Sequence, residues 1–146
     1  MSLDNLVGIS LEKIKPDAVV IRRLMSAAQR NIADAHMMEI SAENRFDAAY
    51  KAIMQLANVA LQANGFRTLT SKPGHHMTMI QTLNQTIGVN QQTVIVLDAL
   101  RKQRNVADYS GDLVPISAVE ECLSNAEALL QSVVDWLEIN QPSLIR

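Results

Sequence analysis

Between Ile116 and Leu137, apolar side chains recur at intervals that alternate between three and four residues. These positions are Ile116, Val119, Leu123, Ala126, Leu130, Val133 and Leu137. An α-helix turns once every 3.6 residues, so this spacing places the apolar side chains on one face. Because such a face is normally buried against other helices, the pattern predicts a helix packed in a bundle.

The few glycine and proline residues fall where helices are expected to begin or end. They separate helical segments at about 16–37, 41–64, 76–87, 91–105 and 116–137. Ser41 is expected to cap the second helix and Gly65 to end it. Residues 4–14 are expected to form a short helical turn, and no alternating pattern typical of a strand is present. We therefore predict an all-α, up-and-down bundle of four to five helices, in one domain over residues 1–146 with its core at about 17–139.

Length and composition agree with one domain that contains no membrane helix. The chain has 146 residues and no apolar run of the roughly 18 to 20 residues that a membrane-spanning helix requires. Its first ten residues do not resemble a secretory signal, and its one cysteine, Cys122, cannot form an intrachain disulfide. We therefore expect a cytoplasmic protein, with Cys122 filling space in the core.

The charge is unevenly distributed along the chain. Residues 1–104 carry twelve Lys or Arg and eight Asp or Glu, whereas residues 105–146 carry one and seven. A positive body favours phosphate groups, but scattered cations are more often ordinary solvated side chains. Charge alone does not decide between these interpretations.

A cluster of cations and amides lies in the segment 100–111. Arg and Lys near a helix C-terminus interact favourably with the helix dipole, which is the ordinary explanation. The functional explanation is that Arg101 and Arg104, three residues apart and therefore on one face, extend into a cleft and hold a phosphate. Asp34 or Glu39 is a candidate carboxylate partner for Arg104.

The hexapeptide from Arg104 to Tyr109, Arg-Asn-Val-Ala-Asp-Tyr, resembles the Arg-x4-6-His motif of the HEPN superfamily, with Tyr109 at the histidine position. Two further stretches are similar to HEPN sequences. Residues 45–50 with 60–67 resemble the second helix and its Gly-aromatic-Arg exit, and residues 74–83 resemble the opening of the third helix. The resemblance covers about residues 17–110.

The resemblance implies a HEPN-like bundle that forms a homodimer, in which Arg and His from two protomers cleave RNA without a metal. Tyrosine has an ordinary pKa of about 10, against about 6.5 for histidine, and is a much weaker base near neutral pH. We therefore expect a non-catalytic or weakly active domain that binds RNA or a nucleotide and needs no cofactor. The expected ligand-binding residues are Arg101, Arg104, Asn105 and Tyr109; if the protein is active, the catalytic ones are Arg104, Asn105 and Tyr109.

Other interpretations remain open. A metal-independent ribonuclease toxin would keep the activity, and a helper module of a nucleotidyltransferase would bind a protein partner instead. Either would fit a toxin-antitoxin setting. The adjacent His75 and His76 point about 100° apart on a helix and do not form a metal site, so His76 is expected to be a half-buried packing residue.

Overall fold

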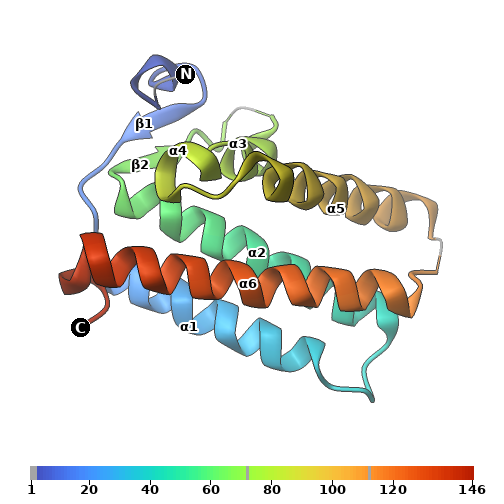
Figure 1. Ribbon diagram of the computed structural model, residues 1–146. Coiled ribbons are helices and arrows are strands. Elements are labelled where there is room, and N and C mark those ends of the chain that lie inside the picture. The colour runs from blue at the N-terminus through green and yellow to red at the C-terminus, as the bar shows by residue number, and fades with distance from the viewer. Residues whose placement is uncertain (1–2, 72, 112) are drawn as a thin grey trace.

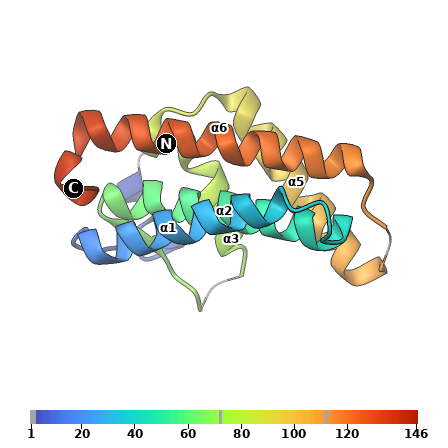
Figure 2. The same cartoon turned by 90° about the horizontal axis from the view of Figure 1, so that it is seen from below.

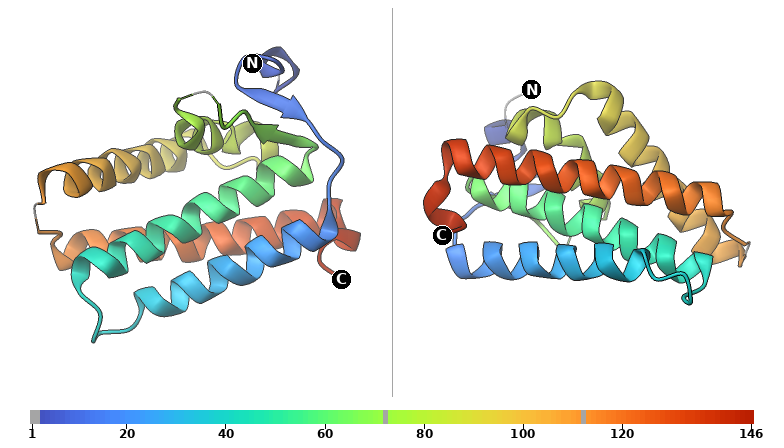
Figure 3. Two further views of the ribbon diagram at one scale, coloured as in Figure 1. Left: turned by 180° about the vertical axis from the view of Figure 1, so that it is seen from behind. Right: turned by 60° about the horizontal axis from the view of Figure 1, so that its bottom comes forward.

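Four long helices make up most of the protein. The computed structural model describes residues 3–71, 73–111 and 113–146, apart from the side chain of Tyr109. The long helices alternate in direction, as an up-and-down bundle requires (Figure 1 and Figure 3). They are α1 (Ala18–Ala35), α2 (Ala42–Ala63), α5 (Gln91–Ser110) and α6 (Ile116–Asn140). The prediction of a mostly helical domain is therefore confirmed.

Short side-chain caps set where the long helices begin. The Asp17 carboxylate accepts a hydrogen bond from the Val19 amide at 2.9 Å, so α1 begins two residues after Pro16. The Ser41 hydroxyl accepts from the Asn44 amide at 3.3 Å and caps α2, as predicted. At the other end of α2, Gly65 has a φ of +89°, a conformation that favours glycine.

Two predicted segments differ from the structure. The third predicted helix is two short ones, α3 (His75–Gln81) and α4 (Leu83–Ile87). Between them, the hydroxyl of Thr82 donates to the carbonyl of Thr78 at 2.8 Å, a local bond typical of places where helices bend. Helix α5 continues to Ser110, five residues beyond its predicted end, and stops at Gly111, which has a φ of +72°.

The expectation that the chain contains no strand was wrong. After a 3-10 turn at Leu3–Leu6, strand β1 (Leu11–Lys13) pairs antiparallel with β2 (Phe66–Thr68). Glu12 lies opposite Arg67 in this pair, and their side chains form an ion pair. Strands of three residues are too short to show an alternating pattern, so the sequence gives no signal for them.

Helix α2 is the centre of the bundle. It contacts α1, α3, α4, α5, α6 and β2. Figure 1 draws α2 between α5 above and α6 with α1 below, and in the view from below α1 runs in front of α2 (Figure 2). Arg45 of α2 is buried, and its Nε donates to the Ala35 carbonyl at 2.8 Å. Ala35 is the last residue of α1, so this bond gives a partner to a carbonyl that has none within its own helix. Cys122 of α6 is also buried, and burial raises the pKa of its thiol to about 12.

The remaining described elements do not alter this architecture. A 3-10 turn (Pro142–Leu144) follows α6 and contacts α1. Within the part of the chain that the structure describes, no helix has both the length and the apolar content needed to cross a bilayer.

Candidate functional site

A cavity of about 320 Å³ opens between α2, α3 and α5. We call it the α2 cleft, because α2 supplies most of its lining. The lining residues are Asp47, Tyr50, Lys51, Met54, Gln55 and Asn58 of α2, His76 and Met79 of α3, and Arg104 of α5. A volume near 300 Å³ is at the small end of the range found for small-molecule sites.

A second cavity of about 370 Å³ adjoins the α2 cleft, and His76 lines both. Its other lining residues are Gly74, His75, Met77, Arg101 and Asn105. The structure thus brings Arg101, Arg104 and Asn105 to one region, but Arg104 faces the α2 cleft while the other two face its neighbour. Tyr109 belongs to α5, and its side chain lies outside the described part of the structure.

Arg104 lies over the ring of Tyr50, with 5.4 Å between the guanidinium carbon and the ring centroid. Its Nε lies 3.3 Å from the Asp47 carboxylate and 3.1 Å from that of Asp108. The partners are therefore not the predicted Asp34 or Glu39. Arg104 therefore pairs with two carboxylates, and with a side chain that is 30 % exposed it also lines the α2 cleft.

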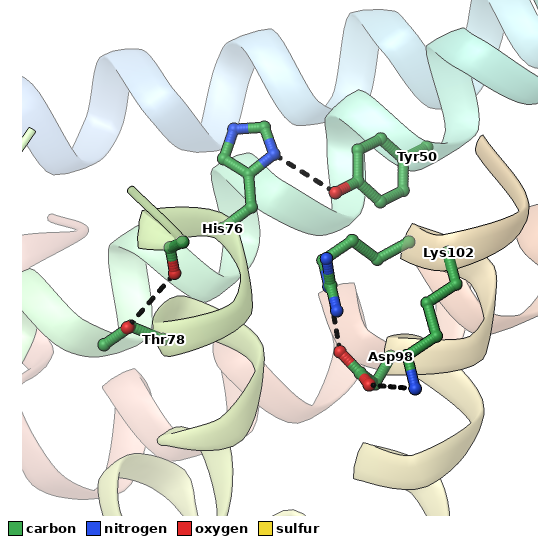
Figure 4. Close-up of polar contacts among 7 residues, drawn as sticks. Tyr50, His76, Thr78, Asp98 and Lys102 are labelled. Atoms are coloured by element: carbon green, nitrogen blue, oxygen red, sulfur yellow. Dashed lines mark hydrogen bonds and ion pairs between the residues drawn. The ribbon is translucent and has the colours of Figure 1, made fainter. Parts of the chain in front are cut away.

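Tyr50 and His76 form a neutral pair at the middle of the cleft. The Tyr50 hydroxyl and His76 Nδ1 are 3.2 Å apart, as Figure 4 shows. Burial raises the pKa of Tyr50 to about 12, even though Arg104 and Arg101 oppose the shift. Burial also lowers the pKa of His76 below 6.5, with further contributions from His75 and the same two arginines. Near pH 7 the phenol is therefore protonated and the imidazole is uncharged.

Asp98 holds the two other cations of this region. Its carboxylate lies 2.9 Å from Arg101 Nε and 3.5 Å from Lys102 Nζ, and Figure 4 shows the contact with Lys102. The Arg101 side chain is only 16 % exposed, so Asp98 neutralises a largely buried charge. Arg104 and the exposed Lys51, by contrast, face the α2 cleft.

No match to this chain was found among models of protein families, curated proteins or solved structures. Among the described side chains, no three His, Cys, Asp or Glu converge in the way that a metal site requires. What the cleft offers is two cations, one carboxylate, a Tyr–His pair and two amides.

The two amides are anchored by hydrogen bonds to residues that do not line the cleft. Asn31 Nδ2 of α1 donates to Gln55 Oε1 at 2.9 Å. Gln62 Nε2, one turn further along α2, donates to Asn58 Oδ1 at 3.1 Å. Each carbonyl oxygen thus has a partner, and among the described residues neither NH₂ group has one.

Sequence reasoning missed most of this lining. Tyr50 falls on the apolar stripe of its helix and His76 is expected to pack, and both do lie partly or wholly inside the bundle. A signal for the others is present: Asp47, Lys51, Gln55 and Asn58 recur at intervals of four, four and three, so they form a polar stripe beside the apolar one. Such a stripe is usually solvated, so by itself it does not indicate a site.

Proposed function

We propose that this protein is a HEPN-type domain that binds RNA or a nucleotide, with the phosphate held by Arg104 in the α2 cleft. The observation that carries the proposal is the position of Arg104: it lines a cavity, its side chain is 30 % exposed, and its guanidinium lies over the Tyr50 ring. A guanidinium in this state can donate two parallel hydrogen bonds to a phosphate.

The charges around the cleft nearly cancel. Arg104 and Lys51 supply two positive charges, and the carboxylates of Asp47 and Asp108, both paired with Arg104, supply two negative charges. Arg101 adds a further positive charge on the far side of His76, and Asp98 offsets it. The proposal therefore depends on the short-range hydrogen bonds that the Arg104 guanidinium can donate to a phosphate rather than on net charge.

Binding can be measured by fluorescence anisotropy with a labelled single-stranded RNA, and by calorimetry with nucleoside monophosphates, at low salt. Arg104→Gln should weaken both by at least about tenfold, since a hydrogen bond to a charged group is typically worth 1.5–3 kcal/mol. Lys51→Gln should weaken both less, because Lys51 is exposed. Arg30→Gln, which changes an exposed arginine on α1, is the matched control.

Wild-type protein that binds neither probe would contradict the proposal, as would an Arg104→Gln variant that binds as well as the control. Because Arg104 pairs with Asp47 and Asp108, each variant should first be shown to unfold at the temperature of the wild type.

A second function, metal-independent RNA cleavage, is favoured by one observation: His76 lines the same cavity as Arg104. In the tautomer that donates Nδ1–H to the Tyr50 oxygen, Nε2 keeps a lone pair and can take the proton of a ribose 2′-hydroxyl. The 2′-oxygen then attacks the phosphorus, and the 5′-oxygen leaves with a proton from water. The products are a 2′,3′-cyclic phosphate and a 5′-hydroxyl. Here His76, rather than Tyr109, takes the role of the family's histidine.

Incubation of labelled RNA with the protein in EDTA tests this second function. Cleavage that yields a cyclic phosphate end, and that is lost in both His76→Gln and Arg104→Gln, would support it. RNA that is bound but stays intact would contradict cleavage and leave binding as the only function.

The resemblance to HEPN domains also leads us to propose a homodimer, and a nucleotidyltransferase as a second partner. Exposed apolar side chains on α5 support the first idea, because Ile95 and Val106 are each 61 % exposed and lie eleven residues, or about three turns, apart on one face. Light scattering after size-exclusion chromatography tests it. A dimer that Val106→Lys converts to a monomer would support this face, and a monomeric wild type would contradict it.

A further inference from the structure

The end of the α2 cleft away from Arg104 carries hydrogen-bond donors without matching acceptors. Gln55 and Asn58 both line the cleft, and the carbonyl oxygen of each accepts a hydrogen bond from Asn31 or Gln62, which do not line it. The NH₂ group of each amide has no partner among the described residues, and it donates and does not accept. Because their NH₂ groups are the available donors, the two side chains favour a ligand whose edge presents hydrogen-bond acceptors.

The walls near these amides are apolar and adaptable. Met54, which is 7 % exposed, and Met79 both line the cleft. Thioether side chains are flexible and make favourable contacts with aromatic rings. The lining thus changes from charged at Arg104 to apolar with amide donors at Gln55 and Asn58, and α2 rises about 10 Å between Lys51 and Asn58. A nucleotide has the same order of groups: phosphate, ribose, and then a flat base with polar edges.

We infer that Gln55 and Asn58 form a base subsite that selects guanine, an inference that rests on the proposed binding of a phosphate at Arg104. Guanine presents two neighbouring acceptors, O6 and N7, on one edge, whereas adenine presents the N7 acceptor beside the donating N6 amino group. Two NH₂ donors match the first edge. Against adenine, one donor would meet another donor and lose its partner, and cytosine likewise presents an amino donor.

Asn31 and Gln62 take part in this selectivity without touching the ligand. Each donates to the carbonyl oxygen of a cleft amide and thereby fixes which end of that amide faces the base. If Asn31 is lost, Gln55 is free to turn its carbonyl oxygen toward the cleft, where it would accept from the adenine amino group. Asn31 is therefore a positioning residue, and its loss should reduce discrimination more than total affinity.

Calorimetry with GMP, AMP and ribose 5-phosphate tests the inference. Wild-type protein should bind GMP about tenfold more tightly than AMP, the size typical of one two-point base contact. Gln55→Met and Asn58→Leu, which remove the donors and add no charge, should bring the ratio of the two affinities close to one and leave ribose 5-phosphate unaffected. Asn31→Leu should also lower the ratio. Gln131→Met, an exposed glutamine on α6, is the control.

The outcomes separate this inference from the function on which it rests. Equal binding of GMP and AMP by the wild type, or tighter binding of AMP, would overturn the guanine subsite while leaving the phosphate site in place. A ratio that survives both Gln55→Met and Asn58→Leu would overturn it as well. Failure of all three compounds to bind would overturn the proposed function and the subsite with it.

Discussion

The Tyr50 hydroxyl lies 3.2 Å from Nδ1 of His76, and this contact joins α2 to α3 in the middle of the α2 cleft. Tyr50 is 2 % exposed, and the guanidinium of Arg104 lies over the face of its ring. The same tyrosine therefore positions both an imidazole and a guanidinium. Substitutions at the pair should change the stability of the protein in opposite regions of pH.

Tyr50→Phe should reduce the loss of stability in alkali. The pKa of Tyr50 is about 12 in the folded protein, against 10.0 for the free group, so the unfolded chain loses this proton first as the pH rises. The stabilisation is present below pH 10 and is lost as the pH rises toward 12. The free energy of unfolding, measured in urea at pH 8, 10 and 11, should fall less steeply for the variant. Equal slopes would show that Tyr50 titrates normally.

His76→Gln should reduce the loss of stability in acid. The pKa of His76 is lowered from 6.5 in the folded protein, so the unfolded chain takes up this proton first as the pH falls. The stabilisation is present above pH 6.5 and is lost as the pH decreases through the folded pKa. Urea unfolding at pH 7.5, 6 and 5 measures the effect. A variant with the wild-type slope would contradict the prediction.

Arg45→Met should destabilise the protein by about 2 kcal/mol, because it removes a buried hydrogen bond to the Ala35 carbonyl that joins α1 and α2. Methionine retains much of the aliphatic length of arginine, so the change tests the bond rather than the packing. Thermal unfolding followed by circular dichroism provides the measurement, with the exposed Arg30→Met as control. A variant within about 0.5 kcal/mol of the control would show that the bond contributes little.

The helices could be predicted well because their determinants are local. Ser41 caps α2 and Gly65 ends it, as each residue's own chemistry indicates. The strand pair could not be predicted, since β1 and β2 have three residues each and lie more than fifty positions apart. Asp108, four residues from Arg104 on the same helix, is a local partner, but Asp47 could not be predicted, because it is 57 residues away and meets Arg104 only once α2 and α5 pack together.

The sequence indicated part of the cavity lining and missed the rest, including the charged Asp47 and Lys51. Arg101, Arg104 and Asn105 do lie around adjoining cavities, and their cationic sequence cluster indicated as much. Tyr50 falls on the apolar face of α2, so the sequence pattern predicts that it packs in the core. Its hydroxyl contacts His76 in the structure. A buried polar group finds a partner as a rule, but the sequence does not say which.

Asp47→Asn should strengthen the binding of a nucleoside monophosphate at low salt. The Asp47 carboxylate lines the cleft and repels a phosphate there, while Asp108 remains to hold Arg104. One unit charge at about 6 Å in water contributes about 0.7 kcal/mol, which corresponds to an affinity change of about threefold. Calorimetry of Asp47→Asn beside Asp34→Asn, an exposed aspartate on α1, isolates the local effect. Weaker binding would mean that Asp47 is needed to position Arg104.

The most direct test of the central claim is an NMR titration of isotopically labelled protein with GMP, in which the backbone amide shifts show where the ligand binds. We expect the largest changes at residues 47–58, 75–79 and 101–105, which surround the α2 cleft, and we expect Arg104→Gln to remove them. An absence of shifts, or shifts confined to the outer faces of α1 and α6, would contradict the assignment of a phosphate site to this cleft.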